Sequence, residues 1–295
     1  MTEQEQLKEI ELFFENMNYS FKARQNYKRL IEQLSENTSC YSNDIIKIID
    51  EIVFVKCKDK FIRELSAKSP LFRARVIDID DIKNCDKGIG FYGSAYYGYN
   101  EENSRECPLL IGGNGRNNIK GQSYLYAADD ELTACSEIKA GLRQLISLAR
   151  FETTKPLKLV DFSRDIAFQE DEKKLYGMSL GIFFTQLMFA FSEPVFNENE
   201  YRITQVISDY FRKTGIDGIA YRSFYTGKTN YTIFNCHHSY IKFVDSRLLT
   251  HQFQNSVFWD FTNKVAIKAE TENYEYNEKV AEKIKTDLAL TMKKG

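Results

Sequence analysis

The chain has 295 residues, of which 43% are hydrophobic and 28% charged, the composition of an ordinary globular protein. This composition excludes a disordered, collagen-like or disulfide-stapled chain, and the length suffices for one large domain or two modest ones. Lysine and arginine number 40 against 42 aspartate and glutamate residues, a formal net charge of −2. Without an overall basic field, nucleic acid is not expected as the main partner.

The first residues, MTEQEQLKEIELFF, carry acidic side chains where a secretory signal has basic and apolar ones. No later run reaches the roughly 18 apolar residues that a membrane-spanning helix needs. We therefore expect a cytoplasmic protein with no membrane partner. The six cysteines include no CxxC pair, which favours reduced thiols over disulfides.

Residues 1–69 predict a small helical domain. Apolar residues recur at helical spacing over 3–17, from Tyr27 to Leu34, and over 44–65. Pro70 marks the end of this unit, because the residue before a proline disfavours helix. We expect these residues to form a docking or regulatory domain.

From residue 70 the chain alternates short strands and helices. The expected strands are 71–78, 123–128, 157–163, 216–223, 231–235 and 240–249, and the expected helices are 131–149, 172–192 and 200–214. Residues 83–118 predict a long loop of the kind that often carries function. The regular βαβ spacing of a doubly wound sheet is missing, so we predict the α+β class. This second domain covers 70–250, and 251–295 form an extension with a charged helix over 276–294.

Two familiar motifs fail on context. Residues 88–93, GIGFYG, match GxGxxG, but a dinucleotide-binding loop follows a buried strand and opens a helix, and this segment does neither. Cys236, His237 and His238 have metal-binding chemistry, yet neighbouring strand residues point to opposite faces, so we expect no metal site. Because His251 is the only other histidine, a Ser/His/Asp or Cys/His triad is disfavoured.

Four charged residues occupy unusual positions. Arg73 and Arg75 lie on one face of an expected strand, and Arg116 lies in a loop rich in Gly and Asn. Glu137 interrupts an otherwise apolar helix. Taken singly, each has an ordinary explanation as a solvent-facing charge. Their order along the chain carries more information than any one of them.

That order resembles the RES-domain family, named for its Arg, Glu and Ser, over about residues 71–245. The resemblance is carried by an FRAR strand, a Gly-Arg-Asn loop, LYxAxDxxTAxxE over 125–137, an LVDFS strand, YxxTQ over 201–205 and GxDGIxYxS over 215–223. The segment 125–137 is its most specific part. Ala74 stands where some members have a tyrosine, and Asn117 where shorter toxins have a tryptophan, which points to a longer, divergent branch.

The resemblance implies a compact fold similar to ADP-ribosyltransferases and an enzyme, a glycohydrolase or phosphorylase, that breaks the nicotinamide–ribose bond of NAD+. NAD+ is then the substrate, and no cofactor is implied. Many members are toxins restrained by an antitoxin, so a toxin or defence effector with an antitoxin or regulatory partner is also implied, and we add self-association as an expectation. The catalytic residues are expected to be Arg73, Tyr126, Glu137 and Ser223. Substrate binding is assigned to Arg75, Arg116, Asn117, Tyr92 and Asn230.

The chemistry of NAD+ suits these residue types. Arg73 or Arg116 offers bidentate donors for the diphosphate, and Tyr126, with Tyr92 or Tyr96, offers a ring for the cationic pyridine. Nicotinamide leaves as a neutral molecule, so one carboxylate suffices. Ser223 has no adjacent histidine and is expected to hydrogen-bond phosphate or the nicotinamide amide rather than act as a nucleophile.

Three alternatives stay open. The first is an ADP-ribosyltransferase that acts on a macromolecule. The second is a non-catalytic module that binds NAD+ or ADP-ribose. The third is a protein whose N-terminal helices bind a partner or cleave RNA. Residues 1–69 contain 11 basic and 12 acidic residues and no histidine, which disfavours the RNA-cleaving version. The sequence does not choose between water, phosphate and a protein side chain as acceptor.

Overall fold

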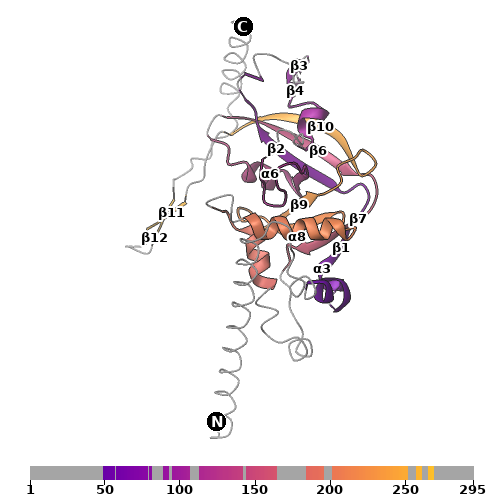
Figure 1. Ribbon diagram of the computed structural model, residues 1–295. Coiled ribbons are helices and arrows are strands. Elements are labelled where there is room, and N and C mark those ends of the chain that lie inside the picture. The colour runs from indigo at the N-terminus through magenta and orange to yellow at the C-terminus, as the bar shows by residue number, and fades with distance from the viewer. Residues whose placement is uncertain are drawn as a thin grey trace.

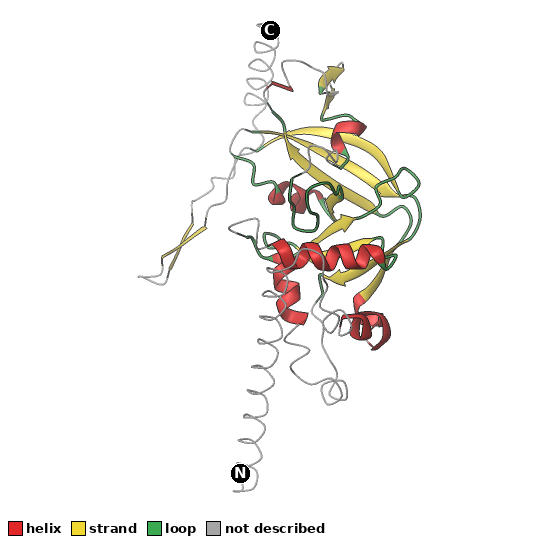
Figure 2. Cartoon of the chain, viewed as in Figure 1, coloured by secondary structure: helices red, strands yellow, loops and turns green. Residues whose placement is uncertain are grey.

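The computed structural model, shown in Figures 1 and 2, has an eight-stranded sheet at its centre. It describes residues 49–56, 58–78, 80–81, 89–92, 95–106, 113–141, 144–164, 184–195, 201–251, 257–260 and 265–268. The strand order is β1-β7-β8-β9-β5-β2-β6-β10. The bounds of these strands, in chain order, are Ile62–Leu65, Pro70–Val76, Leu125–Ala128, Leu145–Thr153, Leu157–Phe162, Gly218–Arg222, Thr229–Ile233 and Ile241–Thr250, for β1, β2 and β5 to β10.

Neighbouring strands of the sheet run antiparallel, except β7 and β8, which are parallel. A mixed sheet of this kind, combined with separate helices, confirms the expectation of α and β structure without a doubly wound parallel sheet. Two hairpins lie outside the sheet: β3 (Gly90–Tyr92) with β4 (Ala95–Tyr97), and β11 (Val257–Asp260) with β12 (Val265–Lys268).

Helices cover different parts of the sheet. Figure 1 shows α8 (Arg202–Lys213) against the β1-β7-β8 end and α6 (Glu131–Glu137) against the β2-β6 end. A helix over residues 184–192 also packs on the first region, through an aromatic core in which the Phe162 and Phe191 rings stack at 4.9 Å. Burying a side chain of this size contributes roughly 1.5–3 kcal/mol.

Small residues let α6 lie close to the sheet. Ala134 of α6 packs in one cluster with Ala74 of β2 and Ala128 of β5. Side chains this short allow a close approach between helix and strands, and this approach sets how far the end of α6 stands from β2. The packing therefore determines where Glu137 lies relative to Arg73.

The prediction of one helix over 131–149 is wrong for the second half of that range. The helix α6 ends at Glu137, and Leu145–Thr153 form β6, which pairs with both β2 and β10. Leu132, expected to face inward, is 71% exposed. A short apolar run does not by its spacing distinguish a buried strand from a helix, and here pairing on both sides decides for the strand.

The expected helix over 44–65 also ends too late. Helical structure covers π-helical η1 (Glu51–Lys56) and α3 (Lys58–Phe61), after which β1 pairs with β7. The sheet thus begins before the expected domain boundary at residue 70. The helices expected over 3–34 and 276–294 lie outside the described residues, so the N-terminal helical domain stays a prediction.

Within the long loop expected over 83–118, the described residues include β3, β4 and the short α5 (Glu101–Ser104). The helix expected over 200–214 is confirmed as α8, and Gly215, with φ of 82°, follows it. Among the described residues, no helix combines the length and the apolar character needed to cross a bilayer.

Candidate active site

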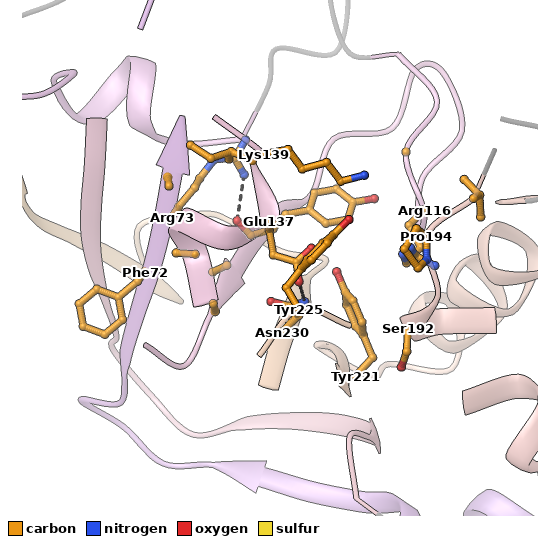
Figure 3. Close-up of a pocket in the computed structure, with 18 of the residues that line it drawn as sticks. Phe72, Arg73, Arg116, Glu137, Lys139, Ser192, Pro194, Tyr221, Tyr225 and Asn230 are labelled. Carbon is orange, nitrogen blue, oxygen red and sulfur yellow. Dashed lines mark hydrogen bonds between the residues drawn. The ribbon is translucent and has the colours of Figure 1, made fainter. Parts of the chain in front are cut away.

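A cavity of about 380 Å³ lies between α6, the 113–118 loop and the segment after the 184–192 helix. Figure 3 shows Arg73, Glu137 and Lys139 on one side of it and Arg116 and Pro194 on the other. The lining residues are Phe72, Arg73, Ala74, Gly115, Arg116, Tyr126, Ala127, Ala128, Ala134, Glu137, Ile138, Lys139, Ser192, Pro194, Val195, Tyr201, Tyr221, Tyr225 and Asn230. Of the nine residues expected at the site, five line this cavity: Arg73, Arg116, Tyr126, Glu137 and Asn230.

Glu137 is the last residue of α6, and two buried donors fix its carboxylate. The Ser223 hydroxyl and the Asn230 amide each donate to Oε1 at 2.7 Å. Asp130 caps the other end of α6, where its side chain accepts from the Thr133 amide at 2.7 Å. A carboxylate at the C-terminal end of a helix opposes the helix dipole, so helix stability does not explain Glu137.

Arg73 reaches the cavity from β2. One of its terminal nitrogens donates to the Tyr126 carbonyl at 3.2 Å. Arg75, two residues on, does not line the cavity, and its guanidinium donates to the Arg105 carbonyl at 2.5 Å. Strand alternation places Arg73 and Arg75 on the same face of β2, so it does not explain why only Arg73 lines the cavity. The difference lies in the bond that Arg75 makes to Arg105, the residue that caps α5.

The Tyr126 hydroxyl organises the loop beside the cavity. It donates to Asn118 Oδ1 at 2.6 Å and accepts from the backbone N–H of Asn117 at 2.9 Å. A side chain at Gly115 would clash with Asn118 Oδ1 and stand 2.8 Å from the Tyr126 hydroxyl, so only glycine fits there. Burial raises the pKa of this hydroxyl well above its usual value, which keeps it protonated as a donor.

Asn117 anchors this loop from within the protein. It is fully buried and does not line the cavity. Its side-chain nitrogen, Nδ2, donates to the Thr232 hydroxyl at 2.5 Å, and its side-chain oxygen, Oδ1, accepts from the Ser208 hydroxyl at 3.2 Å. With both ends of the side chain bonded inside the fold, Asn117 positions the loop and does not face the site to which it was assigned.

The YxxTQ motif of α8 fixes the same loop. The Thr204 hydroxyl donates to the Arg116 carbonyl at 2.5 Å. The Gln205 amide donates to the carbonyls of Gly115 and Asn118 at 2.9 and 3.2 Å. Buried carbonyls require such partners, which gives these motif residues a structural reason.

Arg116 lines the far side of the cavity and is held by backbone. Its two terminal nitrogens donate to the carbonyls of Ala190 and Glu193 at 2.8 and 2.7 Å. Its guanidinium also lies 5.3 Å from the centroid of the Tyr201 ring. A cation at the end of the 184–192 helix stabilises the last carbonyls of that helix.

Aromatic rings supply much of the remaining wall. Tyr201, Tyr221 and Tyr225 join Tyr126 there, and burial raises the pKa of the Tyr221 hydroxyl to about 12. The sequence predicts Tyr126 as an aromatic residue of the site, together with Tyr92 or Tyr96, and Tyr126 lines the cavity. Tyr92 belongs to β3, in the separate hairpin, and its assignment to the substrate stays a prediction.

Some residues that line the cavity were not predicted as site residues, but they lie close in sequence to residues that were. Tyr221 and Tyr201 lie within the motifs at 215–223 and 201–205, and Tyr225 follows Ser223 by two positions. Lys139 follows Glu137 by two positions and lines the cavity. The charged side chains among the described lining residues are therefore three cations and one carboxylate, an arrangement suited to an anionic ligand.

Comparisons with known proteins give two matches of different kinds. The family model of the RES domain matches residues 99–254, more than half of the chain. One matching solved structure is the M. tuberculosis MbcT–MbcA toxin–antitoxin complex, with 11% identity and a TM-score of 0.36, covering 71% of this chain and 93% of that chain. No curated protein matches the sequence.

Proposed function

Because this chain belongs to the RES-domain family, we propose that it is an enzyme that breaks the bond between nicotinamide and ribose in NAD+. Glu137 is the catalytic carboxylate, and Arg73 binds the anionic part of the dinucleotide. Ser223 and Asn230 position Glu137. The tyrosines of the cavity wall receive the pyridine ring.

One observation carries this proposal: among the described residues that line the cavity, two buried donors hold the one carboxylate, and the other charged side chains are cations. Both donors use Oε1 of Glu137, and we propose that Oε2 meets the ribose hydroxyls. The carbon–nitrogen bond breaks, its electron pair goes to the pyridine nitrogen, and positive charge develops on the ribose. A preorganised negative group stabilises this charge without having to reorganise during the reaction.

The chemistry needs no general acid, because nicotinamide leaves neutral. The ribosyl cation is then captured by water, which loses a proton and gives ADP-ribose, or by inorganic phosphate, which gives ADP-ribose-1″-phosphate. A toxin or defence role with an antitoxin or regulatory partner, a cytoplasmic location and self-association belong to the same proposal. So does a division into an N-terminal helical domain, the sheet domain and an extension after residue 250, with the first boundary before β1 because this strand pairs with β7.

The test compares the wild type with Glu137→Gln. A glutamine can still accept both hydrogen bonds through its carbonyl oxygen, so the fold is retained while the charge is lost. We expect nicotinamide release, followed by chromatography, to fall about 100- to 1,000-fold. The matched control is Glu131→Gln on the same helix, whose carboxylate pairs with Arg247 outside the cavity and whose loss should leave the rate unchanged.

Equal release by the wild type and Glu137→Gln would refute the catalytic assignment. NAD+ binding without nicotinamide release by the wild type would indicate a binding module instead. Nicotinamide release that requires a protein acceptor, which becomes labelled with ADP-ribose, would indicate a transferase. Mass analysis of the product with and without phosphate distinguishes hydrolysis from phosphorolysis.

A further inference from the structure

Lys139 is a site residue to which neither the sequence motifs nor the reaction has given a role. It lines the cavity two residues after Glu137, and Figure 3 shows its side chain reaching over Tyr225. Its ammonium lies 5.5 Å from the centroid of the Tyr225 ring. Lysine at this place adds a cation to the side of the cavity on which Arg73 and Glu137 already lie.

The backbone of Lys139 makes this choice of residue costly. Its φ is 49°, in the left-handed region that glycine adopts without strain. The position directly follows the helix cap Ile138, where helices usually end in glycine. A strained residue whose side chain lines a cavity suggests that the side chain, rather than the backbone, is what the position requires.

The ammonium is also available to a ligand. The side chain of Lys139 is exposed, and its contact with Tyr225 is with a ring and a hydroxyl rather than a carboxylate. A lysine ammonium is cationic at neutral pH, and the hydrogen bond with the Tyr225 hydroxyl raises its pKa further. Arg116, by contrast, stands across the cavity with both terminal nitrogens bonded to backbone carbonyls.

We propose that Lys139 binds the diphosphate of the dinucleotide, together with Arg73, and so sets the affinity of the site for phosphorylated ligands. This inference rests on the proposed function and names the part of the substrate that Lys139 contacts. If Glu137 holds the ribose, the phosphate on the 5′ carbon of that ribose lies near Lys139, which is two residues from Glu137 along the chain. A contact remote from the breaking bond is made equally in the ground state and the transition state, so it governs KM and leaves kcat unchanged.

The chain offers a matched control. Lys68 is also an exposed lysine in the left-handed region, with φ of 64°, but it lies in the turn between β1 and β2 and does not line the cavity. Replacing either lysine by glycine removes an ammonium and relieves the same kind of backbone strain. The two variants differ in whether the lost cation faces the site and in the contact with Tyr225, which only Lys139 makes.

The experiment measures binding of NAD+ and of nicotinamide riboside, which lacks phosphate, to the full chain and its variants. For Lys139→Gly we expect a melting temperature no lower than that of the wild type, a Kd and KM for NAD+ about tenfold higher, and an unchanged kcat. Binding of nicotinamide riboside should not change. Lys139→Arg should retain most of the affinity for NAD+, Lys139→Asn should lose it, and Lys68→Gly should match the wild type.

Unchanged NAD+ affinity in Lys139→Gly, or equal weakening of NAD+ and nicotinamide riboside, would overturn the inference while leaving the proposed function in place. A wild type that binds NAD+ but releases no nicotinamide would refute the proposed function, and the Lys139 inference would then be decided by the binding data. A wild type that does not bind NAD+ would refute both.

Discussion

Removing the Ser223 hydroxyl tests whether the site depends on a rigidly held carboxylate. The hydroxyl is buried and donates to Glu137 Oε1 at 2.7 Å, and the Asn230 amide donates to the same oxygen at the same distance. A hydrogen bond to a charged group contributes about 1.5–3 kcal/mol. Since about 1.4 kcal/mol is a factor of ten, losing it in the transition state costs about tenfold to 150-fold in rate.

In Ser223→Ala, Asn230 still holds the carboxylate, so we expect kcat to fall about tenfold, at the lower end of that range. The substitution also removes long contacts from the amides of Tyr225 and Thr226 to the hydroxyl, at 3.3 and 3.4 Å. We therefore expect the melting temperature to fall by about 2–4 °C, the effect of roughly 1 kcal/mol in a domain of this size. The rates of nicotinamide release are compared at saturating NAD+ and at a temperature well below the melting temperature of either protein.

The control is Ser136→Ala. Ser136 precedes Glu137 on α6, but its hydroxyl donates to the Leu132 carbonyl, so its loss should leave kcat unchanged. The Ser223→Ala, Asn230→Ala double variant leaves Oε1 without either donor. Its loss should approach that of Glu137→Gln and exceed the sum of the single effects if one donor compensates for the other. A folded Ser223→Ala variant with more than half of the wild-type kcat would refute this reasoning.

Two further predictions concern stability. The Thr133 amide lowers the pKa of Asp130 below its unfolded value of 3.8, so the cap stabilises the protein above about pH 4 and is lost as the pH falls through the lowered pKa. Asp130→Ala should lower the free energy of unfolding by about 1 kcal/mol at neutral pH and by less in acid. Asp130→Asn should keep the cap at both pH values. Denaturant unfolding measures these losses, and a loss in Asp130→Ala that does not depend on pH would contradict the prediction. Gln205→Leu removes the side-chain donor to the Gly115 carbonyl and one of the two donors to the Asn118 carbonyl, which keeps the bond from the Gly115 backbone N–H. The loss should destabilise the protein by about 1–3 kcal/mol, and an unchanged melting temperature would exclude this role.

The parts of the fold that sequence patterns predicted well are those with strong local signals. The amphipathic face and the following Gly215 predicted α8, and Asp130 predicted the start of α6. The patterns failed where distant pairing decides: Leu145–Thr153 carry apolar residues that suit a helix, but β2 and β10 supply hydrogen bonds on both sides. Ile62–Leu65 became a strand for the same reason, through β7.

The residues of the site divide in the same way. Motif order in the chain was sufficient to select Arg73, Glu137 and Asn230, because residue type and spacing are properties of the sequence. Which of the selected residues face the cavity depends on packing. Asn117 was selected by the same reasoning and is buried, because Thr232 and Ser208, both distant in sequence, bond its amide.

The sequence by itself thus determined the family, the class of fold and the chemical groups that the site contains. Only the tertiary structure decided their arrangement: Ser223 and Asn230 meet Glu137 across 86 and 93 positions of the chain. It also brought Lys139 and Tyr225 together at the cavity. The physical reason is that a hydrogen bond or a ring contact depends on distances of a few ångströms in space, and local patterns along the chain do not fix these distances for residues so far apart.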